Sequence, residues 1–210
     1  ALSTVNSRIQ LLGLERGYAV VQVNYRLAKE SEFPELIHDI KAALRFIKGN
    51  ADAFLLNPQR IGAWGDSAGG SLAALIGTSS GIGALEDLSM GFEDQDTRVQ
   101  AVVDLYGDVY LDPENSMRLI YLGIPENAEK ASAPTYITKD DPPFLIMHGS
   151  EDGVVAYEES VNFSNALMGV IGEDEVTLIL IEGAGHASYD FEEPDCIEEI
   201  YAFLDEILKD

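Results

Sequence analysis

Residues 60–76 read RIGAWGDSAGGSLAALI, and this segment is the strongest indication of the fold class. Its first residues predict a short buried strand, and the small apolar residues at its end predict a helix that packs tightly on a sheet. Between the two, residues 65–69 match the pattern G-x-S-x-G with Ser67 at the centre. A nucleophilic serine needs such a sharp strand-to-helix turn, in which the two glycines leave room for the backbone. Ser67 is therefore the candidate nucleophile, and the Ala68 amide at the positive helix N-terminus is the candidate oxyanion donor.

The same glycine-rich turn has a second interpretation, as a phosphate-binding loop. Neither G-x-x-x-x-G-K-[ST] nor G-x-G-x-x-G occurs there. The formal net charge of −24 also makes phosphate groups, nucleic acid and anionic membranes repulsive partners at moderate salt. We therefore favour the serine nucleophile, and we expect no nucleic-acid partner and no membrane partner.

Outward from this motif, short continuous apolar runs alternate with apolar residues at helical spacing. This alternation is typical of buried parallel strands separated by helices, and it predicts a three-layer α/β fold with helices on both faces of a mostly parallel sheet. The irregular, proline-containing residues 108–143 predict a cap or pocket-wall insertion. The predicted strands span residues 18–24, 60–64, 99–106, 144–147 and 176–181, and the clearest predicted helices span 4–16, 34–49 and 68–76.

Length and composition predict a single domain over residues 1–210. With 46% hydrophobic residues, the chain can bury one sizeable core.

The sequence lacks an apolar run of about 20 residues and a basic-then-apolar N-terminal segment, so we expect a soluble, cytoplasmic protein. Its single cysteine, Cys196, excludes an internal disulfide and a cysteine-based metal cluster. We expect neither a cofactor nor a metal.

A serine nucleophile needs an imidazole that removes its proton, and the chain has three histidines. His186 lies in a glycine-containing loop directly after the last predicted strand, where parallel sheets assemble their sites. His38 falls inside a predicted helix, which favours a surface or boundary position. His148 ends a predicted strand, which favours a backbone role or a partly buried ring. His186 is therefore the candidate base.

The acid that orients the base is expected on the loop after the preceding strand, in the chain order Ser, Asp, His. Asp152 and Glu151 both lie on that loop, and Gly153 beside Asp152 predicts a tight turn that aims the carboxylate. Asp152 is the candidate acid, with Glu151 as the alternative. Glu182 and Asp190 flank the base, but the simpler interpretation of both is a charge exposed to solvent.

Five segments, in this order along the chain, resemble the α/β-hydrolase esterases of the hormone-sensitive-lipase and bacterial feruloyl or acetylxylan esterase type. The resemblance runs over nearly the whole chain and implies an α/β-hydrolase fold. It also implies that Ser67, Asp152 and His186 form a catalytic triad, and that small acyl esters, including those on plant polysaccharides, are the substrates. The segments are residues 23–27, 65–70, 141–144, 148–149 with Asp152, and 182–186.

One family segment has no counterpart in the sequence. Family members carry a His-Gly-Gly segment after the third strand, whose amides complete the oxyanion hole, and none precedes Ser67. The resemblance therefore implies an N-terminally shortened fold with a slot between residues 18–24 and 60–64. This slot has three possible explanations. A preceding segment has been removed or is a separate chain, the two strands pair directly with each other, or a second copy of the chain covers the exposed edge. Because an uncovered edge invites association, we expect a homo-oligomer, with a dimer as the first expectation.

These features predict a serine carboxylesterase for short-chain acyl or aryl esters, whose partner is a small-molecule ester. In this interpretation Ser67 attacks the ester carbonyl, His186 accepts and returns the proton, and Asp152 orients the imidazole. The alternatives are a serine peptidase of the oligopeptidase type and a hydrolase scaffold with weak or no activity. A substrate panel of acetyl, butyryl and feruloyl esters separates the possible acyl groups.

Candidate substrate-binding residues are Asp66 and Tyr106. The rings of Tyr106, Tyr110 and Tyr121 could stack on a sugar or an aromatic group, although core packing is the commoner role for any one of them. The predicted insertion at 108–143 would form much of the pocket wall.

Overall fold

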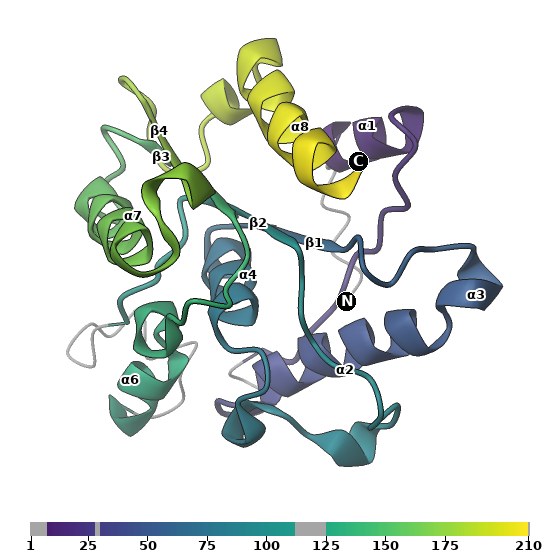
Figure 1. The fold of residues 1–210 in the computed structure, drawn as a ribbon. Coiled ribbons are helices and arrows are strands. Elements are labelled where there is room, and N and C mark those ends of the chain that lie inside the picture. The colour runs from purple at the N-terminus through teal and green to yellow at the C-terminus, as the bar shows by residue number, and fades with distance from the viewer. Residues whose placement is uncertain (1–7, 28–29, 112–124, 210) are drawn as a thin grey trace.

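The computed structural model describes residues 8–27, 30–111 and 125–209 of the 210-residue chain. Within this part of the chain, the strands form one parallel sheet in the order β1-β2-β3-β4 (Figure 1). The register places Trp64 beside Val103 and Asp104 beside Ile146. The strands are β1 (Gly62–Asp66), β2 (Ala101–Leu105), β3 (Phe144–Gly149) and β4 (Val176–Ile181).

Helices precede, connect and follow these strands. The α-helices are α1 (Arg8–Glu15), α2 (Glu35–Gly49), α3 (Ala51–Phe54), α4 (Ala68–Thr78), α6 (Ala128–Ala131), α7 (Tyr157–Ile171) and α8 (Pro194–Leu208). The short 3₁₀ helices are η1 (Gly83–Leu85), η2 (Leu88–Met90), η3 (Pro125–Asn127), η4 (Ala133–Tyr136), η5 (Glu173–Glu175) and η6 (Tyr189–Glu192).

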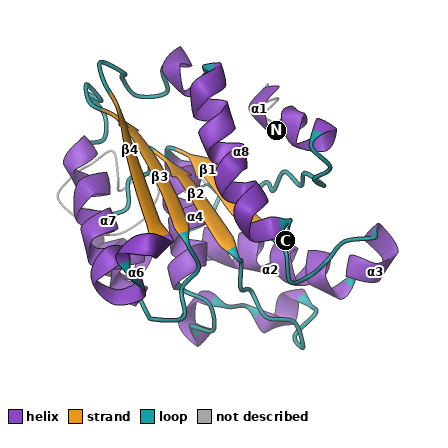
Figure 2. Ribbon diagram, turned by 45° about the horizontal axis from the view of Figure 1, so that its top comes forward, coloured by secondary structure: helices purple, strands orange, loops and turns teal. Residues whose placement is uncertain are grey.

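Side chains that alternate along the strands build one core on each face of the sheet. Val102 of β2 packs with α2, α4 and α7, whereas its neighbour Val103 packs with α8. Figures 1 and 2 show α8 and α1 over one face of the sheet and α2, α4 and α7 over the other. This arrangement confirms the three-layer α/β fold that the sequence predicts.

The sequence predicts a strand at residues 18–24, and this prediction is wrong. These residues belong to the described chain, but no strand is present there. An extended segment becomes a strand only when a neighbour pairs with its backbone groups, and β1 pairs with β2 alone in the described sheet. Direct pairing between residues 18–24 and β1, one of the three explanations above, is thereby excluded.

Part of the predicted insertion at 108–143 lies outside the described residues, namely 112–124. Its second half forms η3, α6 and η4. The hydroxyl of Thr78 in α4 donates to the Ala133 carbonyl at 3.0 Å, so η4 is anchored on the helix that follows the candidate nucleophile. Residues 4–7 of the first predicted helix also fall outside the described chain, which starts with α1.

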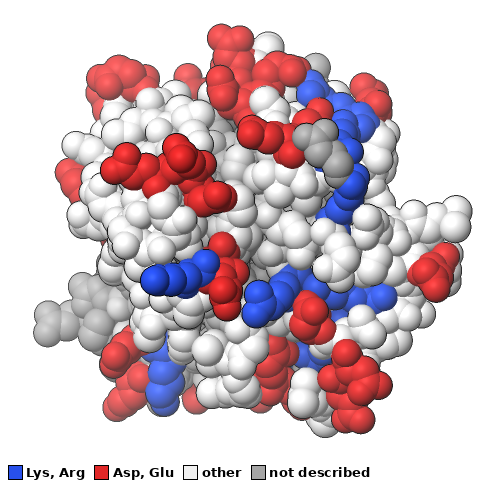
Figure 3. Space-filling model, viewed as in Figure 1, with Lys and Arg blue, Asp and Glu red and all other residues white. Residues whose placement is uncertain are grey.

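The distribution of charge follows the acidic composition. Asp and Glu form several groups on the face shown in Figure 3, with fewer Lys and Arg between them. Among the described residues, no helix combines the length and the apolar character that a membrane span requires. The same part of the chain holds no group of three or more His, Cys, Asp or Glu side chains arranged for a metal ion.

Candidate active site

Ser67 lies at a sharp turn between β1 and α4. Its backbone has φ 51° and ψ −118°, a conformation that L-residues rarely adopt. The Ser67 amide donates to the Leu105 carbonyl on β2 at 2.9 Å, which fixes the turn over the neighbouring strand. A Cβ atom on Gly65 would overlap the Gly69 carbonyl oxygen, so glycine is required at 65. Gly69 itself faces open space, so the expected steric need for glycine at 69 is absent.

The structure brings Ser67, His186 and Asp152 together in one chain of hydrogen bonds. Ser67 Oγ lies 2.8 Å from His186 Nε2, and His186 Nδ1 lies 2.7 Å from Asp152 Oδ2. His186 lies in the loop after β4 and Asp152 in the loop after β3. Both loops leave the carboxyl ends of parallel strands. Residues that occur in the order Ser, Asp, His along the chain are expected to meet there.

The environment of Asp152 favours its ionised form. Burial disfavours the charge, but amide donors at Val155 and Val154 and the imidazole of His186 outweigh it, so the pKa of Asp152 lies below its usual value. The two amides lie 2.9 and 2.8 Å from Oδ1. An ionised carboxylate on this side of His186 requires a hydrogen on Nδ1 and leaves Nε2 free to accept the Ser67 proton.

The Ala68 amide opens α4 directly after the serine. As the first amide of a helix it has no acceptor within the helix, and the helix dipole adds positive potential there. Its position therefore matches that of an oxyanion donor, and Asp66 is exposed on the other side of Ser67, at the end of β1.

Tyr106 supports the base more directly than the sequence suggests. Its ring meets the imidazole of His186 edge to face at a centroid distance of 5.0 Å and meets Phe191 at 4.5 Å. Only 6% of the residue is exposed, and burial together with the charges of Asp66 and Glu192 raises the pKa of its hydroxyl. The ring is therefore packed against the site, and its predicted role in binding substrate stays a prediction.

Two buried groups near the site were not predicted as parts of it. His148 contacts Asp152 Oδ2 through Nε2 at 3.1 Å, and its Nδ1 lies 2.7 Å from Ser160 Oγ. Asp104 on β2 is fully buried; its Oδ1 accepts from the Gly107 amide at 2.9 Å, and its Oδ2 has no hydrogen-bond partner. Burial raises the pKa of Asp104 to about 7. A single polar residue inside an apolar strand was the available sequence signal for both.

The other residues that the sequence offered for the site lie outside the hydrogen-bonded series of Ser67, His186 and Asp152. Glu151, the alternative acid, is exposed, as are Glu182 and Asp190, and His38 lies on α2. Tyr110 packs against the main core, and Tyr121 lies outside the described residues. Cys196 is a half-buried thiol whose pKa is raised by burial and by nearby acids such as Asp195.

Comparison with known proteins identifies the family. The BD-FAE family matches residues 3–167, more than half of the chain. The chain belongs to the BD-FAE family. This match, together with the esterases described next, confirms the resemblance to α/β-hydrolase esterases that the sequence motifs indicate.

Several relatives of this BD-FAE chain are named esterases. Esterase LipC from Mycobacterium tuberculosis is 31% identical over 186 residues, which are 81% of this chain and 45% of LipC. A solved structure described as a truncated form of a carbohydrate esterase from gut microbiota has a TM-score of 0.79 and 27% identity, covering 94% of this chain and 76% of that one. A bifunctional GH43-CE protein from Bacteroides eggerthii has a TM-score of 0.83 and 30% identity, covering 96% and 31%. The chain spans less than half the length of the curated relatives it matches.

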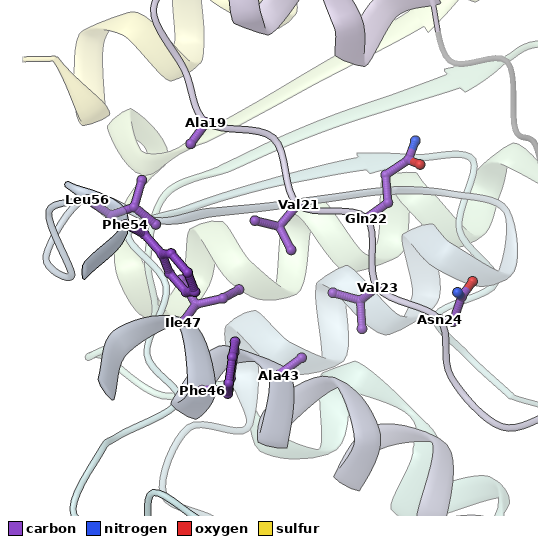
Figure 4. A pocket seen from close by; sticks show the side chains of 10 residues that line it. All are labelled: Ala19, Val21, Gln22, Val23, Asn24, Ala43, Phe46, Ile47, Phe54 and Leu56. Atoms are coloured by element: carbon purple, nitrogen blue, oxygen red, sulfur yellow. The ribbon is translucent and has the colours of Figure 1, made fainter. Parts of the chain in front are cut away.

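The BD-FAE chain also has an apolar pocket of about 480 Å³ between the extended residues 19–24 and helices α2 and α3 (Figure 4). Val21 and Val23 point toward α2 in this view, and Val21 is 54% exposed. None of the three hydrogen-bonded site residues lines this pocket. Its lining residues are Ala19, Val21, Gln22, Val23, Asn24, Ala43, Phe46, Ile47, Phe54 and Leu56.

Proposed function

We propose that this chain is a serine carboxylesterase that hydrolyses short acyl esters through a covalent acyl-enzyme. The observation that carries the proposal is the hydrogen-bonded chain from Ser67 Oγ through His186 to Asp152, with contacts of 2.8 and 2.7 Å. These are the distances that a nucleophile, its base and the orienting acid require.

In the proposed cycle, Ser67 Oγ attacks the ester carbonyl while His186 Nε2 takes its proton. The C–O bond to the alcohol breaks, and the imidazolium returns the proton to the leaving alkoxide. Water then attacks the acyl-enzyme by the same route and releases the acid. Asp152 stays ionised throughout and stabilises the imidazolium, while the Ala68 amide donates to the oxyanion.

The substrate class rests on relatives. LipC is named an esterase, and the solved relative from gut microbiota is named a carbohydrate esterase. We therefore propose acyl groups carried by sugars, with acetyl and feruloyl esters as the first candidates. The neutral ester group also suits a chain with a net charge of −24, which would repel anionic substrates.

The deciding experiment compares Ser67→Ala with the parent on 4-nitrophenyl acetate. The variant is expected to lose on the order of 10⁴-fold or more in kcat and to lose labelling by a fluorophosphonate. Ser89→Ala, which removes an exposed serine elsewhere in the chain, is the matched control and retains both. Equal hydrolysis by Ser67→Ala and the parent would end the proposal.

A substrate panel then separates the candidate activities. Acetyl, butyryl and feruloyl esters are compared with a peptide anilide at matched concentration. We expect an ester to give the highest kcat/KM, and faster cleavage of the anilide would identify a peptidase instead.

We also propose a homodimer. The support is the outer edge of β1, which pairs with β2 alone in the described sheet, together with the exposed Val21 beside the apolar pocket. Light scattering coupled to size exclusion is expected to give twice the chain mass of 22.8 kDa. A mass of one chain at all concentrations would contradict this proposal without affecting the esterase activity.

A further inference from the structure

A second imidazole contacts the acid of the proposed triad. His148 lies near the end of β3, and its Nε2 is 3.1 Å from Asp152 Oδ2, the same oxygen that lies 2.7 Å from His186 Nδ1. His148 is 0% exposed, so it cannot touch a substrate. The proposed cycle uses Ser67, His186 and Asp152 and gives this contact no role.

The contacts of His148 determine where its proton lies. Nε2 faces Asp152 Oδ2 and, also at 3.1 Å, the Val155 carbonyl oxygen, and both are acceptors. Nε2 must therefore carry a hydrogen and donate it. Nδ1 lies 2.7 Å from Ser160 Oγ, whose hydroxyl donates to a ring nitrogen that has no hydrogen. Burial lowers the pKa of His148, which agrees with a neutral ring.

His148 completes the set of donors around the Asp152 carboxylate. Oδ1 accepts from the amides of Val154 and Val155, and Oδ2 accepts from both imidazoles. Without His148, Oδ2 would keep His186 as its single imidazole donor, and a side chain that fixes the carboxylate plane on that side would be lost.

The same side chain ties the acid's loop to two rigid elements. His148 belongs to β3, Ser160 belongs to α7 and is itself fully buried, and Val155 lies on the loop between them. Side chains held by packing and by such outer hydrogen bonds keep a reactive group within a few tenths of an ångström of its working position. A shift of about 1 Å in such a group can lower the rate on the order of 100-fold.

We propose that His148 is a positioning residue that orients the Asp152 carboxylate toward His186. This inference rests on the proposed function and deepens it. His148 acts through Asp152, and the reacting atoms remain those of Ser67, His186 and the ester.

The test uses two amide variants that differ in reach. The amide nitrogen of Gln in His148→Gln extends to the region of Nε2, whereas that of Asn in His148→Asn extends only to the region of Nδ1. His148→Asn is expected to lower kcat for 4-nitrophenyl acetate about 10- to 100-fold with KM within about twofold. His148→Gln is expected to stay within about threefold of the parent, because it restores the donor to Asp152. Parental kcat in His148→Asn would overturn the proposal.

A double-mutant cycle separates positioning from a general structural effect. If His148 acts through Asp152, adding His148→Asn to Asp152→Asn changes kcat by less than about twofold, because the two effects are not additive. The same fold-loss in both backgrounds would show that His148 acts by another route and would overturn the proposal.

A second variant covers the case in which His148→Asn does not fold, as judged by circular dichroism. Ser160→Ala removes the hydroxyl that sets the His148 tautomer and is expected to lower kcat several-fold in the parent and not in Asp152→Asn. Parental kcat in Ser160→Ala would then overturn the inference. Ser67→Ala keeps the two proposals apart: its activity tests the esterase mechanism, while the His148 variants test positioning alone.

Discussion

The ring of Tyr106 meets the imidazole of His186 edge to face, with ring centroids 5.0 Å apart and planes inclined by 66°. Such aromatic pairs are worth about 0.5–1.5 kcal/mol beyond the area they bury. Tyr106 is therefore expected to restrain the base. We predict that Tyr106→Ala lowers kcat by roughly tenfold, because the imidazole gains rotational freedom. Tyr106→Phe keeps the ring and is expected to stay near the parent. Steady-state kinetics on one ester compare the variants, and equal kcat values in Tyr106→Ala and the parent would refute the restraint.

Neighbouring acids offer a matched pair at the candidate site. Asp152 contacts His186 at 2.7 Å, whereas Glu151 is exposed. Asp152→Asn is expected to lower kcat on the order of 10³- to 10⁴-fold, because an amide no longer favours the required tautomer and does not stabilise the imidazolium. Glu151→Gln should leave kcat within about twofold. The reverse pattern would make Glu151 the acid.

Two glycines of the motif should respond oppositely to an added methyl group. Gly65→Ala places a Cβ on the Gly69 carbonyl oxygen and is expected to lower the free energy of unfolding by about 2 kcal/mol or more. Gly69→Ala adds a Cβ in open space inside α4, where alanine favours the helix by up to about 1 kcal/mol. Urea unfolding measures both, and a Gly65→Ala variant as stable as Gly69→Ala would contradict the close approach.

The buried Asp104 predicts a pH-dependent difference in stability between the parent and Asp104→Asn. Because its pKa is raised to about 7 when folded, the folded state binds a proton that the unfolded state loses near pH 4. The contribution of Asp104 to stability therefore falls as the pH rises from about 4 to 7, by at most about 1.4 kcal/mol per pH unit.

Asn cannot ionise, so the Asp104→Asn variant should gain stability relative to the parent across that range, with a constant difference above about pH 7. Urea unfolding at several pH values measures the difference. Asp94→Asn, which changes an exposed acid elsewhere in the chain, is the control measured over the same pH range. A difference for Asp104→Asn that does not change between about pH 4 and 7 would show that the pKa of Asp104 is not raised in the folded state.

Local patterns predicted much of the sheet and the three interacting site residues. The predicted strand at 176–181 coincides with β4, and the predicted helix at 68–76 differs from α4 only at its end. These elements were predictable because apolar runs and helical spacing report burial directly. Ser67 follows from a local motif, and the positions of Asp152 and His186 follow from the topology of parallel strands.

Two of the errors and omissions depend on neighbours that are distant in the sequence. Residues 18–24 have the composition of a strand but no strand beside them to pair with. On α2, Lys41 and Arg45 are fully buried, which helical spacing of apolar residues did not indicate; both form ion pairs with Glu86, and Arg45 also donates to the Gly91 carbonyl. His148 and Asp152 are only four residues apart, but their contact depends on how the loop after β3 folds back, which the apolar spacing of the strand does not indicate.

The backbone of Ser67 places function and stability in opposition at one position. Its φ of 51° and ψ of −118° belong to a region that glycine occupies freely, and holding another residue there costs about 1–3 kcal/mol. A chain selected only for the stability of its folded state would carry glycine at 67. The fold instead accepts this local cost where the hydroxyl is presented, and the hydrogen bond from the Ser67 amide to the Leu105 carbonyl holds the strained turn against β2.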